Sequence, residues 1–373
     1  MKAWPKAFMG KLFQVEKGKI GIMAATPGNY PLVTTGEAFL SHIEPHFSGD
    51  AVCIPLISAT GHGHASLKRL HHIKGEFAAG SILCACINQS PDRVLARFAY
   101  YYLSACKDSV LIPLMQGTAN MSMKVQDIAG VEIPVPPLEE QQAIVARLDL
   151  LTEQTRQLEA NLDAIERDAQ NLLRAYIFHP PGKKPLKRPM AELVTMRQPD
   201  VRVDRLAQYQ FAGVYSFGRG VFASVNKAGS EFAYERLSTV CAGDFTYPKL
   251  MAWEGALGVV PPECDGMVVS PEFPVFTINT EAILPEVMDI YFRTPEVWPE
   301  LAEISGGTNM RRRRLQPSAF LSYEMPVPSM SSQLKLRELF LQTKELKTKH
   351  TAIRAANAAL LPATLERIFQ QAH

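Results

Sequence analysis

One stretch of the chain, from Ile133 to His179, constrains the fold more than any other part. Between Pro137 and Pro180 it contains neither proline nor glycine. Glu139 and Glu140 follow the first prolines and would lie in the first turn of a helix, where negative charge suits the exposed amides. At about 1.5 Å per residue this helix would be about 60 Å long, too long for one small domain to cover. We therefore predict a long helix that needs a partner helix.

The apolar residues of this stretch recur at alternating spacings of four and three, the pattern of a coiled-coil seam. A second segment near the C-terminus has the same pattern. Residues 138–178 hold 8 acidic and 4 basic side chains, and residues 332–373 hold 3 acidic and 7 basic ones. Opposite charge favours pairing of the two segments with each other. We expect an antiparallel helix pair, with docking of each helix on an outside protein as the alternative. The predicted seam residues are Ile144, Leu148, Leu151, Leu158, Leu162, Ile165, Leu336, Leu339, Leu346, Ile353 and Leu360.

Short motifs indicate that the chain is a tandem repeat. Gly-Thr-Ala-Asn-Met at 117–121 matches Gly-Thr-Asn-Met at 307–310, and a Pro-Val-Pro triplet follows each at 134–136 and 326–328. The period is roughly 190 residues. The predicted segments are a globular block at 1–137, a long helix at 138–179, a Pro/Lys-rich linker at 180–189, a second block at 190–330 and a C-terminal helix at 331–373.

Both blocks mix strand and helix signals, so the predicted fold class is α/β in the mixed, α+β sense. Short apolar runs at 52–57, 82–87 and 274–278 favour buried strands, and residues 94–105 and 285–293 favour helices. The chain is 47% hydrophobic and 20% charged, which is typical of soluble globular proteins. No signal peptide or membrane-spanning run is evident, so we expect a cytoplasmic protein without membrane contact.

The two junctions resemble a known family. Val-Pro-Pro-Leu-Glu-Glu-Gln-Gln at 135–142, followed by the long helix, resembles the specificity subunit of type I restriction-modification systems, and the likeness covers essentially the whole chain. In the second block, Gly243 to Leu250 and Arg313-Arg314-Leu315 look like a target recognition domain of that family. The second junction departs from the pattern, because Ser329-Met330-Ser331-Ser332-Gln333 lacks the Pro-Leu-x-Glu-Gln form.

The resemblance implies a non-catalytic subunit with two target recognition domains, at 1–137 and 190–330, that read the two halves of an asymmetric site in double-stranded DNA. It implies two methyltransferase subunits as partners, and restriction or translocase subunits as possible further ones. No cofactor is expected on this chain, while S-adenosylmethionine, ATP and Mg are expected on the partners. Reading base edges requires donors such as Arg, Lys, Asn and Gln on loops. The DNA-binding candidates are Thr34, Thr35, Lys68, Arg69, Gln116, Asn120, Lys124, Arg219, Lys227, Lys249, Asn309, Arg311, Arg312, Arg313 and Arg314.

Other kinds of chemistry are less favoured. His62, His64, His71 and His72 with Cys84 and Cys86 suggest zinc by residue type, but their spacing matches no zinc pattern, so no metal is predicted. Asp244 and Glu254 lack the constellation of a nuclease, and no methyltransferase or phosphate-binding motif is present, so no catalytic residue is predicted. The alternative function is a coiled-coil adaptor that binds proteins without DNA specificity, and the arginine run would then be a solvated loop.

Overall fold

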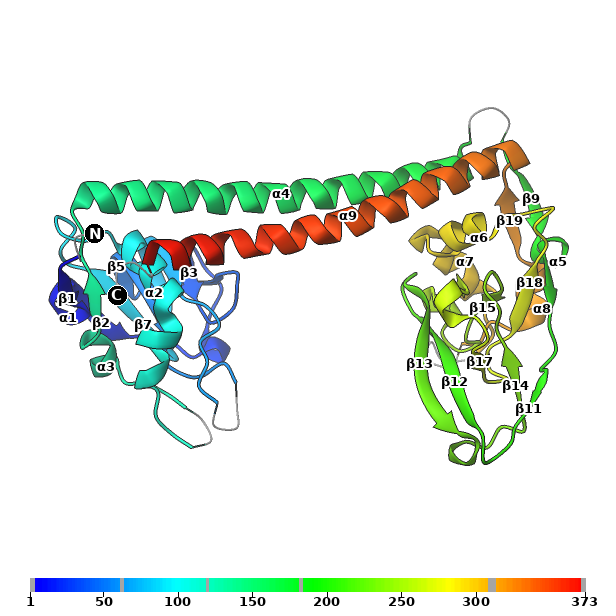
Figure 1. Cartoon of the computed structure of the whole chain (residues 1–373), viewed down its shortest axis with the longest axis horizontal. Helices are drawn as coiled ribbons and strands as arrows, with labels where there is room; N and C mark the ends of the chain where they lie inside the picture. The colour runs from blue at the N-terminus through cyan, green and yellow to red at the C-terminus, as the bar shows by residue number, and fades with distance from the viewer. Residues whose placement is uncertain (1–3, 61–63, 119–120, 181–183, 308–312, 370–373) are drawn as a thin grey trace. The chain divides into compact units, whose positions relative to one another are not determined.

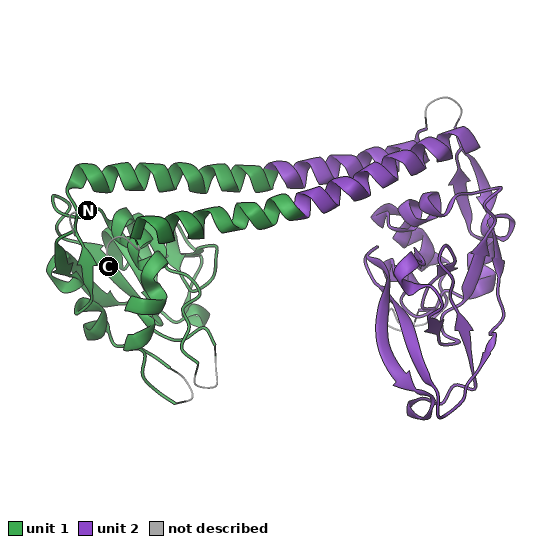
Figure 2. Cartoon of the chain, in the orientation of Figure 1, with its two compact units in different colours: residues 1–160, 352–373 green, residues 161–351 purple. Residues whose placement is uncertain are grey.

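The computed structural model describes residues 4–60, 64–118, 121–180, 184–307 and 313–369. The chain forms two compact units, residues 1–160 with 352–373 and residues 161–351 (Figure 2). Two long helices, α4 (Leu138–Phe178) and α9 (Met330–Phe369), contribute to both units. The predicted boundaries at 137 and 330 therefore mark where the long helices begin, not where the compact units end.

The first unit is built on a six-stranded sheet of order β2-β7-β5-β6-β3-β4, in which only β3 and β6 pair in parallel. The same unit also contains a two-stranded antiparallel sheet formed by β1 and β8. The helices are α1, α2 and α3. The bounds are β1 Lys6–Phe8, α1 Met9–Leu12, β2 Phe13–Lys17, β3 Tyr30–Val33, β4 Leu40–His42, β5 Phe47–Pro55, β6 His71–Ala79, β7 Leu83–Asn88, α2 Ala96–Val110, α3 Val125–Ala129 and β8 Glu132–Pro134.

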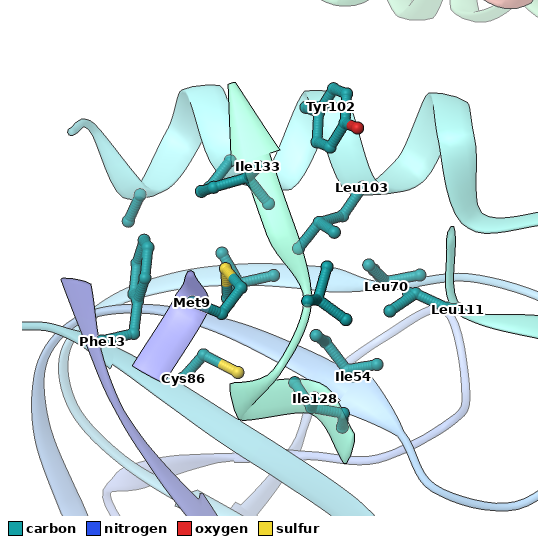
Figure 3. Close-up of a cluster of buried hydrophobic side chains, with 14 of the residues drawn as sticks. Met9, Phe13, Ile54, Leu70, Cys86, Tyr102, Leu103, Leu111, Ile128 and Ile133 are labelled. Carbon is teal, nitrogen blue, oxygen red and sulfur yellow. The ribbon is translucent and has the colours of Figure 1, made fainter. Parts of the chain in front are cut away.

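Both faces of this sheet are buried. Alternate residues of β5 belong to different cores, with Val52 and Ile54 in one and Ala51 and Cys53 in the other. Side chains along a strand alternate between faces, so a continuous apolar run is what a sheet covered on both sides requires. The larger core gathers residues of the sheet, α2 and α3 (Figure 3).

The second unit contains a four-stranded sheet of order β10-β18-β15-β16 and a five-stranded sheet of order β11-β14-β17-β12-β13. A two-stranded sheet joins β9 to β19, so the end of the predicted linker is a strand. The bounds are β9 Leu186–Pro189, α5 Met190–Leu193, β10 Val194–Met196, β11 Val201–Arg202, β12 Gln208–Tyr215, β13 Gly220–Ala228, β14 Arg236–Thr239, β15 Phe245–Thr246, β16 Gly258–Val259, β17 Val268–Val269, β18 Val275–Ile278, α6 Pro285–Phe292, α7 Trp298–Glu303, α8 Pro317–Ser322 and β19 Glu324–Val327.

The structure repeats the pattern that the sequence predicts. Each unit has a two-stranded sheet whose first strand leads into a one-turn helix, α1 or α5. The amide of Met9 donates to the carbonyl oxygen of Val131 at 2.7 Å, and the amide of Met190 donates to that of Tyr323 at 2.9 Å. Met9 and Met190 are both fully buried. The predicted mixed fold, with two globular domains and a pair of long helices, is confirmed.

A buried glutamine joins each long helix to its own domain. The side-chain amide of Gln141 donates to the carbonyl oxygens of Arg93 and Pro136, and its oxygen accepts from the amide of Leu95, at 2.7–2.9 Å. Gln333 repeats this arrangement in the second unit. It donates to the carbonyl oxygens of Ala282 and Pro328 and accepts from the amide of Leu284, at 2.8–3.1 Å. Leu95 and Leu284 each precede the first residue of a domain helix, α2 or α6, so the glutamine aligns two helix starts.

The long helices pair in antiparallel fashion within each unit. In the first unit Asn357 of α9 donates to the carbonyl oxygen of Thr155 and to the carboxylate of Glu159, at 3.0 and 2.7 Å. In the second unit His350 lies 2.9 Å from the carboxylate of Glu166. Within the first unit Arg354 of α9 pairs with Glu159, whereas Asn357, which follows Arg354, contacts Thr155, which precedes Glu159. The two helices therefore run in opposite directions there (Figure 1).

The predicted seam residues differ in how far they are buried. Leu148, Leu162 and Leu336 are buried, and Ile144, Leu151, Leu339 and Leu346 are partly buried. Four predicted residues, Leu158, Ile165, Ile353 and Leu360, are 36–48% exposed. The interface instead uses the polar residues beside them, because charge pairs and a buried amide occupy several seam positions. A search for apolar periodicity therefore selects the residues next to those that make the contacts between the helices.

Among the described residues, no helix has the length and apolar character that a membrane span requires.

Candidate nucleic-acid interface

Each domain carries a Gly-Thr loop that is closed in the same way. In the first, Gln116 and Ser122 exchange two backbone hydrogen bonds of 2.8 and 2.9 Å. In the second, Gly306 and Arg314 exchange two of 3.1 and 2.8 Å. The residue after each bridge is anchored as well, since the amide of Met123 donates to Leu56 and that of Leu315 donates to Lys249. The loops are therefore held firmly at their bases, as loops that present side chains to a ligand need to be.

In the first domain a second loop is braced beside the Gly-Thr loop. The Ser58 amide donates to the carbonyl oxygen of Met121 at 2.9 Å, and the hydroxyls of Ser58 and Thr60 both donate to the carbonyl oxygen of His64. Lys107 of α2 donates to the carbonyl oxygens of Leu67 and Lys68, which ties this loop to the helix. A backbone hydrogen bond therefore links the two loops.

A third loop, after β3, reaches the same region. Arg69 lies 3.2 Å from the carboxylate of Glu37, which follows Thr34 and Thr35. Thr34 is buried and its hydroxyl accepts from the amide of Gly36, so it shapes the loop instead of facing solvent. His71 is nearby; burial, and next the positive charge of Arg69, lower its pKa below the ordinary value. His71 therefore stays neutral at neutral pH.

The structure thus brings most first-domain candidates to one set of linked loops. Lys68, Gln116 and Lys124 are exposed, and Arg69 and Thr35 are partly exposed. Asn120 lies outside the described residues.

The candidates of the second domain fall into two groups. Lys249 and Arg314 lie together, because Lys249 donates to the carbonyl oxygen of Pro271 at 2.9 Å and Arg314 pairs with Glu272 at 2.7 Å. Arg313 donates to the carbonyl oxygen of Ala302 at 3.4 Å. Arg313 and Arg314 are thus held by neighbours, unlike the freely solvated loop of the alternative interpretation. Asn309, Arg311 and Arg312 lie outside the described residues.

Arg219 and Lys227 form the other group, on the hairpin of β12 and β13, and both are exposed. The Arg219 guanidinium lies 4.6 Å from the ring centroid of Tyr215, which stacks on Phe222 at 3.7 Å. No sequence pattern predicts this arrangement, because the spacing within a hairpin does not reveal which aromatic ring lies beneath a cation.

A polar network that sequence analysis missed joins the first domain to α4. His72 lies 2.6 Å from Asp50 through Nε2, while its Nδ1 accepts from Arg97 at 3.2 Å. Arg97 also pairs with Asp149 of α4 at 2.8 Å, and the Tyr101 hydroxyl donates to the same carboxylate. Burial first, and then the hydrogen bond to Asp149, raises the pKa of Tyr101 to about 12, which keeps its proton in place. Residues far apart in sequence form this network, so no local sequence motif predicts it.

The groups considered for other chemistry have structural partners. Asp244 is 5% exposed, pairs with Arg197 at 2.6 Å and accepts from the amide of Cys241. It organises a turn. Among the described residues, no three His, Cys, Asp or Glu side chains are placed to hold a metal ion. Cys84 and Cys86 are fully buried in the core, and His62 lies outside the described residues.

Comparison with known proteins agrees with this architecture. Residues 1–167 match the family model described as "Type I restriction modification DNA specificity domain". No curated protein sequence matches the chain. Among solved structures, the S subunit of a type I restriction-modification system from M. genitalium is 14% identical with a TM-score of 0.50, covering 97% of this chain and 96% of that one.

Two further structures are similar over nearly the whole chain. The HsdS subunit from Thermoanaerobacter tengcongensis is 16% identical with a TM-score of 0.53, covering 100% of this chain and 97% of that one. A chain from a study of complex assembly and conformational transition of the type I R-M system is 15% identical with a TM-score of 0.61, covering 99% and 98%.

The chain therefore has the fold of the specificity subunits of type I restriction-modification systems. By sequence, its residues 1–167 match the model of the DNA specificity domain family of those systems, so the resemblance inferred from the sequence is confirmed over that part of the chain.

Proposed function

We propose that this chain is a non-catalytic specificity subunit that reads a bipartite, asymmetric site in double-stranded DNA and recruits two methyltransferase subunits to it. The duplicated construction carries the proposal. Each domain holds a polar loop on the same two-way backbone bridge, and each is fixed to a long helix by the same buried glutamine. Two domains of similar construction but different surface residues, carried on one chain, suit a DNA site with two different halves.

The cations around the loops support contact with DNA. Lys68, Lys124, Arg219 and Lys227 are exposed, and the network at Lys249 and Arg314 adds further donors. Exposed lysine and arginine side chains neutralise phosphates and release counterions, while those on braced loops can also read base edges. The chain need not be strongly basic as a whole for this to work.

An apolar stripe on α4 supports docking of a partner. Leu158, Ile165 and Leu172 recur every seven residues and are 36%, 47% and 48% exposed. Seven-residue spacing keeps them on one face of the helix, and the described residues leave this face partly exposed. In this proposal the methyltransferase subunits cover such faces and supply S-adenosylmethionine, with ATP and Mg belonging to any restriction subunits.

The test is selection from a random double-stranded DNA library by the chain reconstituted with its methyltransferase subunits. Two short specific sequences separated by a fixed, unread spacer are expected, with affinity that falls steeply as salt rises. A complex that assembles but enriches no sequence would favour the adaptor function instead. Repeating the selection with a chain whose first domain is exchanged should change one half of the site and leave the other.

A further inference from the structure

The turn between β12 and β13 holds an aromatic residue in a backbone conformation that it disfavours. Phe217 has a φ of +64°, and within the described residues it is the one non-glycine residue with positive φ. Its neighbours Gly218 and Gly220 also have positive φ. A glycine or asparagine would suit position 217 better, because a side chain with a Cβ is strained in the left-handed region. The chain nevertheless carries phenylalanine there.

The surrounding structure imposes this conformation. The Phe217 amide donates to the carbonyl oxygen of Glu254 at 2.8 Å, and the Gly218 amide donates to that of Gly255 at 3.0 Å. A Cβ at Gly218 would lie 2.9 Å from the carbonyl oxygen of Arg293, so the turn also packs tightly against the end of α6. The turn is therefore a fixed platform, not a loose loop.

The platform presents its aromatic ring outward. The ring of Phe217 meets Trp298 on one side, with ring centroids 6.2 Å apart, yet the residue remains 64% exposed. A large apolar side chain held in a strained, rigid turn and left mostly in water gains little for folding. Backbone strain of this kind is concentrated at sites where a side chain contacts a ligand.

A positioned cation lies next to the ring. Arg219 is exposed, its guanidinium rests over the ring of Tyr215, and its Nε donates to the carbonyl oxygen of Ser216 at 3.2 Å. None of the described carboxylates forms an ion pair with Arg219. An outward aromatic ring beside a preorganised, uncompensated guanidinium suits a ligand that offers both a flat apolar face and a negative charge. Nucleotides offer both.

From this geometry we propose that the turn formed by Ser216 to Arg219 is a DNA-contacting element of the second recognition domain. Phe217 packs against a base, and Arg219 contacts the neighbouring phosphate. The proposal rests on the proposed DNA-reading function and deepens it, because it places a specificity-determining residue outside the Gly-Thr loop. Apolar side chains that press on base steps discriminate between sequences through unstacking and through contact with the thymine methyl group.

The test uses the full chain in complex with its methyltransferase subunits and the DNA site that the wild-type complex selects from a random library. In Phe217→Gly the backbone strain is relieved, so the unfolding temperature should rise. Binding should weaken about tenfold, the scale of one lost base contact, and selection should relax at positions of one half-site only. Arg219→Gln should weaken binding to all sequences and lower the salt slope by about one phosphate contact.

Leu206→Ala is the matched control, because Leu206 is 93% exposed in the same domain but has no such platform. It should bind like the wild type. Unchanged affinity and unchanged sequence selection in Phe217→Gly would overturn the proposal and leave the DNA-reading function standing. A variant that assembles poorly with the methyltransferase subunits but selects the same DNA would assign the turn to protein docking, which also overturns it. If the wild-type complex selects no sequence, it is the underlying function that fails.

Discussion

Replacing Gln141 by methionine should loosen the joint between the first domain and its long helix. Gln141 is fully buried and makes three hydrogen bonds, of which the one to Pro136 is itself buried. Methionine preserves the size of the side chain but leaves one amide and two carbonyl oxygens unpaired. A buried polar group that loses its partner costs about 1–3 kcal/mol, and two of these three are only partly buried. We therefore expect the free energy of unfolding of the first unit to fall by about 3 kcal/mol.

Urea unfolding with a reporter for each unit measures this loss. Trp4 lies in the first unit and Trp253 and Trp298 lie in the second, so replacing the latter pair by phenylalanine isolates the first transition. With a slope of about 2 kcal/mol per molar urea, the midpoint should fall by about 1.5 M. Gln142→Met is the control, since Gln142 occupies the same turn but is exposed. A Gln141→Met midpoint within about 0.2 M of that control would refute the view that the glutamine fixes the helix to the domain.

Three further predictions address the helix pair and a buried histidine. His350→Leu should lower the free energy of unfolding by about 2 kcal/mol, whereas the double variant with Glu166→Leu should recover it in a double-mutant cycle, because paired leucines suit a seam. If the double variant is instead the least stable of the three, the expectation that leucines can replace this pair is wrong. His71 has a lowered pKa in the folded state, so its contribution to stability is present above its ordinary pKa of 6.5 and is lost as the pH falls below that value. His71→Gln should show a smaller loss of unfolding free energy between pH 7 and pH 5 in titrated denaturation, and an equal loss would contradict this. Finally, four residues inserted after Ala160 with four after Ile353 add roughly 6 Å to the pair, so the DNA spacer should lengthen by about one or two base pairs. An unchanged spacer would show that the helices do not set it.

The sequence predicted the architecture well because its signals are local and strong. Prolines flank the long helix, no glycine interrupts it, and the apolar runs at β5 and β7 are continuous because both faces of that sheet are buried. It missed β6 and β13, because their charged and exposed residues interrupt the alternation of apolar and polar side chains that is typical of a strand. It also placed Leu158 and Ile165 in the seam, where the structure has Glu159 and Glu166.

The candidate site was harder to predict because it depends on contacts between distant segments. Gln116 and Lys124 were predicted from their residue types beside a repeated motif. The pairing of Arg314 with Glu272, and the platform of Tyr215 and Phe222 beneath Arg219, come from the tertiary fold and leave no spacing signature.

Mapping of methylated bases tests the central claim most directly. A host that lacks other DNA methylation would express the methyltransferase subunits with or without this chain, and its genome would be sequenced with a method that detects methylated adenine. We predict methylation only when the chain is present, confined to one bipartite sequence with a fixed spacer. Methylation that occurs at the same sites without the chain, or at no defined sequence with it, would contradict the claim that this chain supplies the specificity.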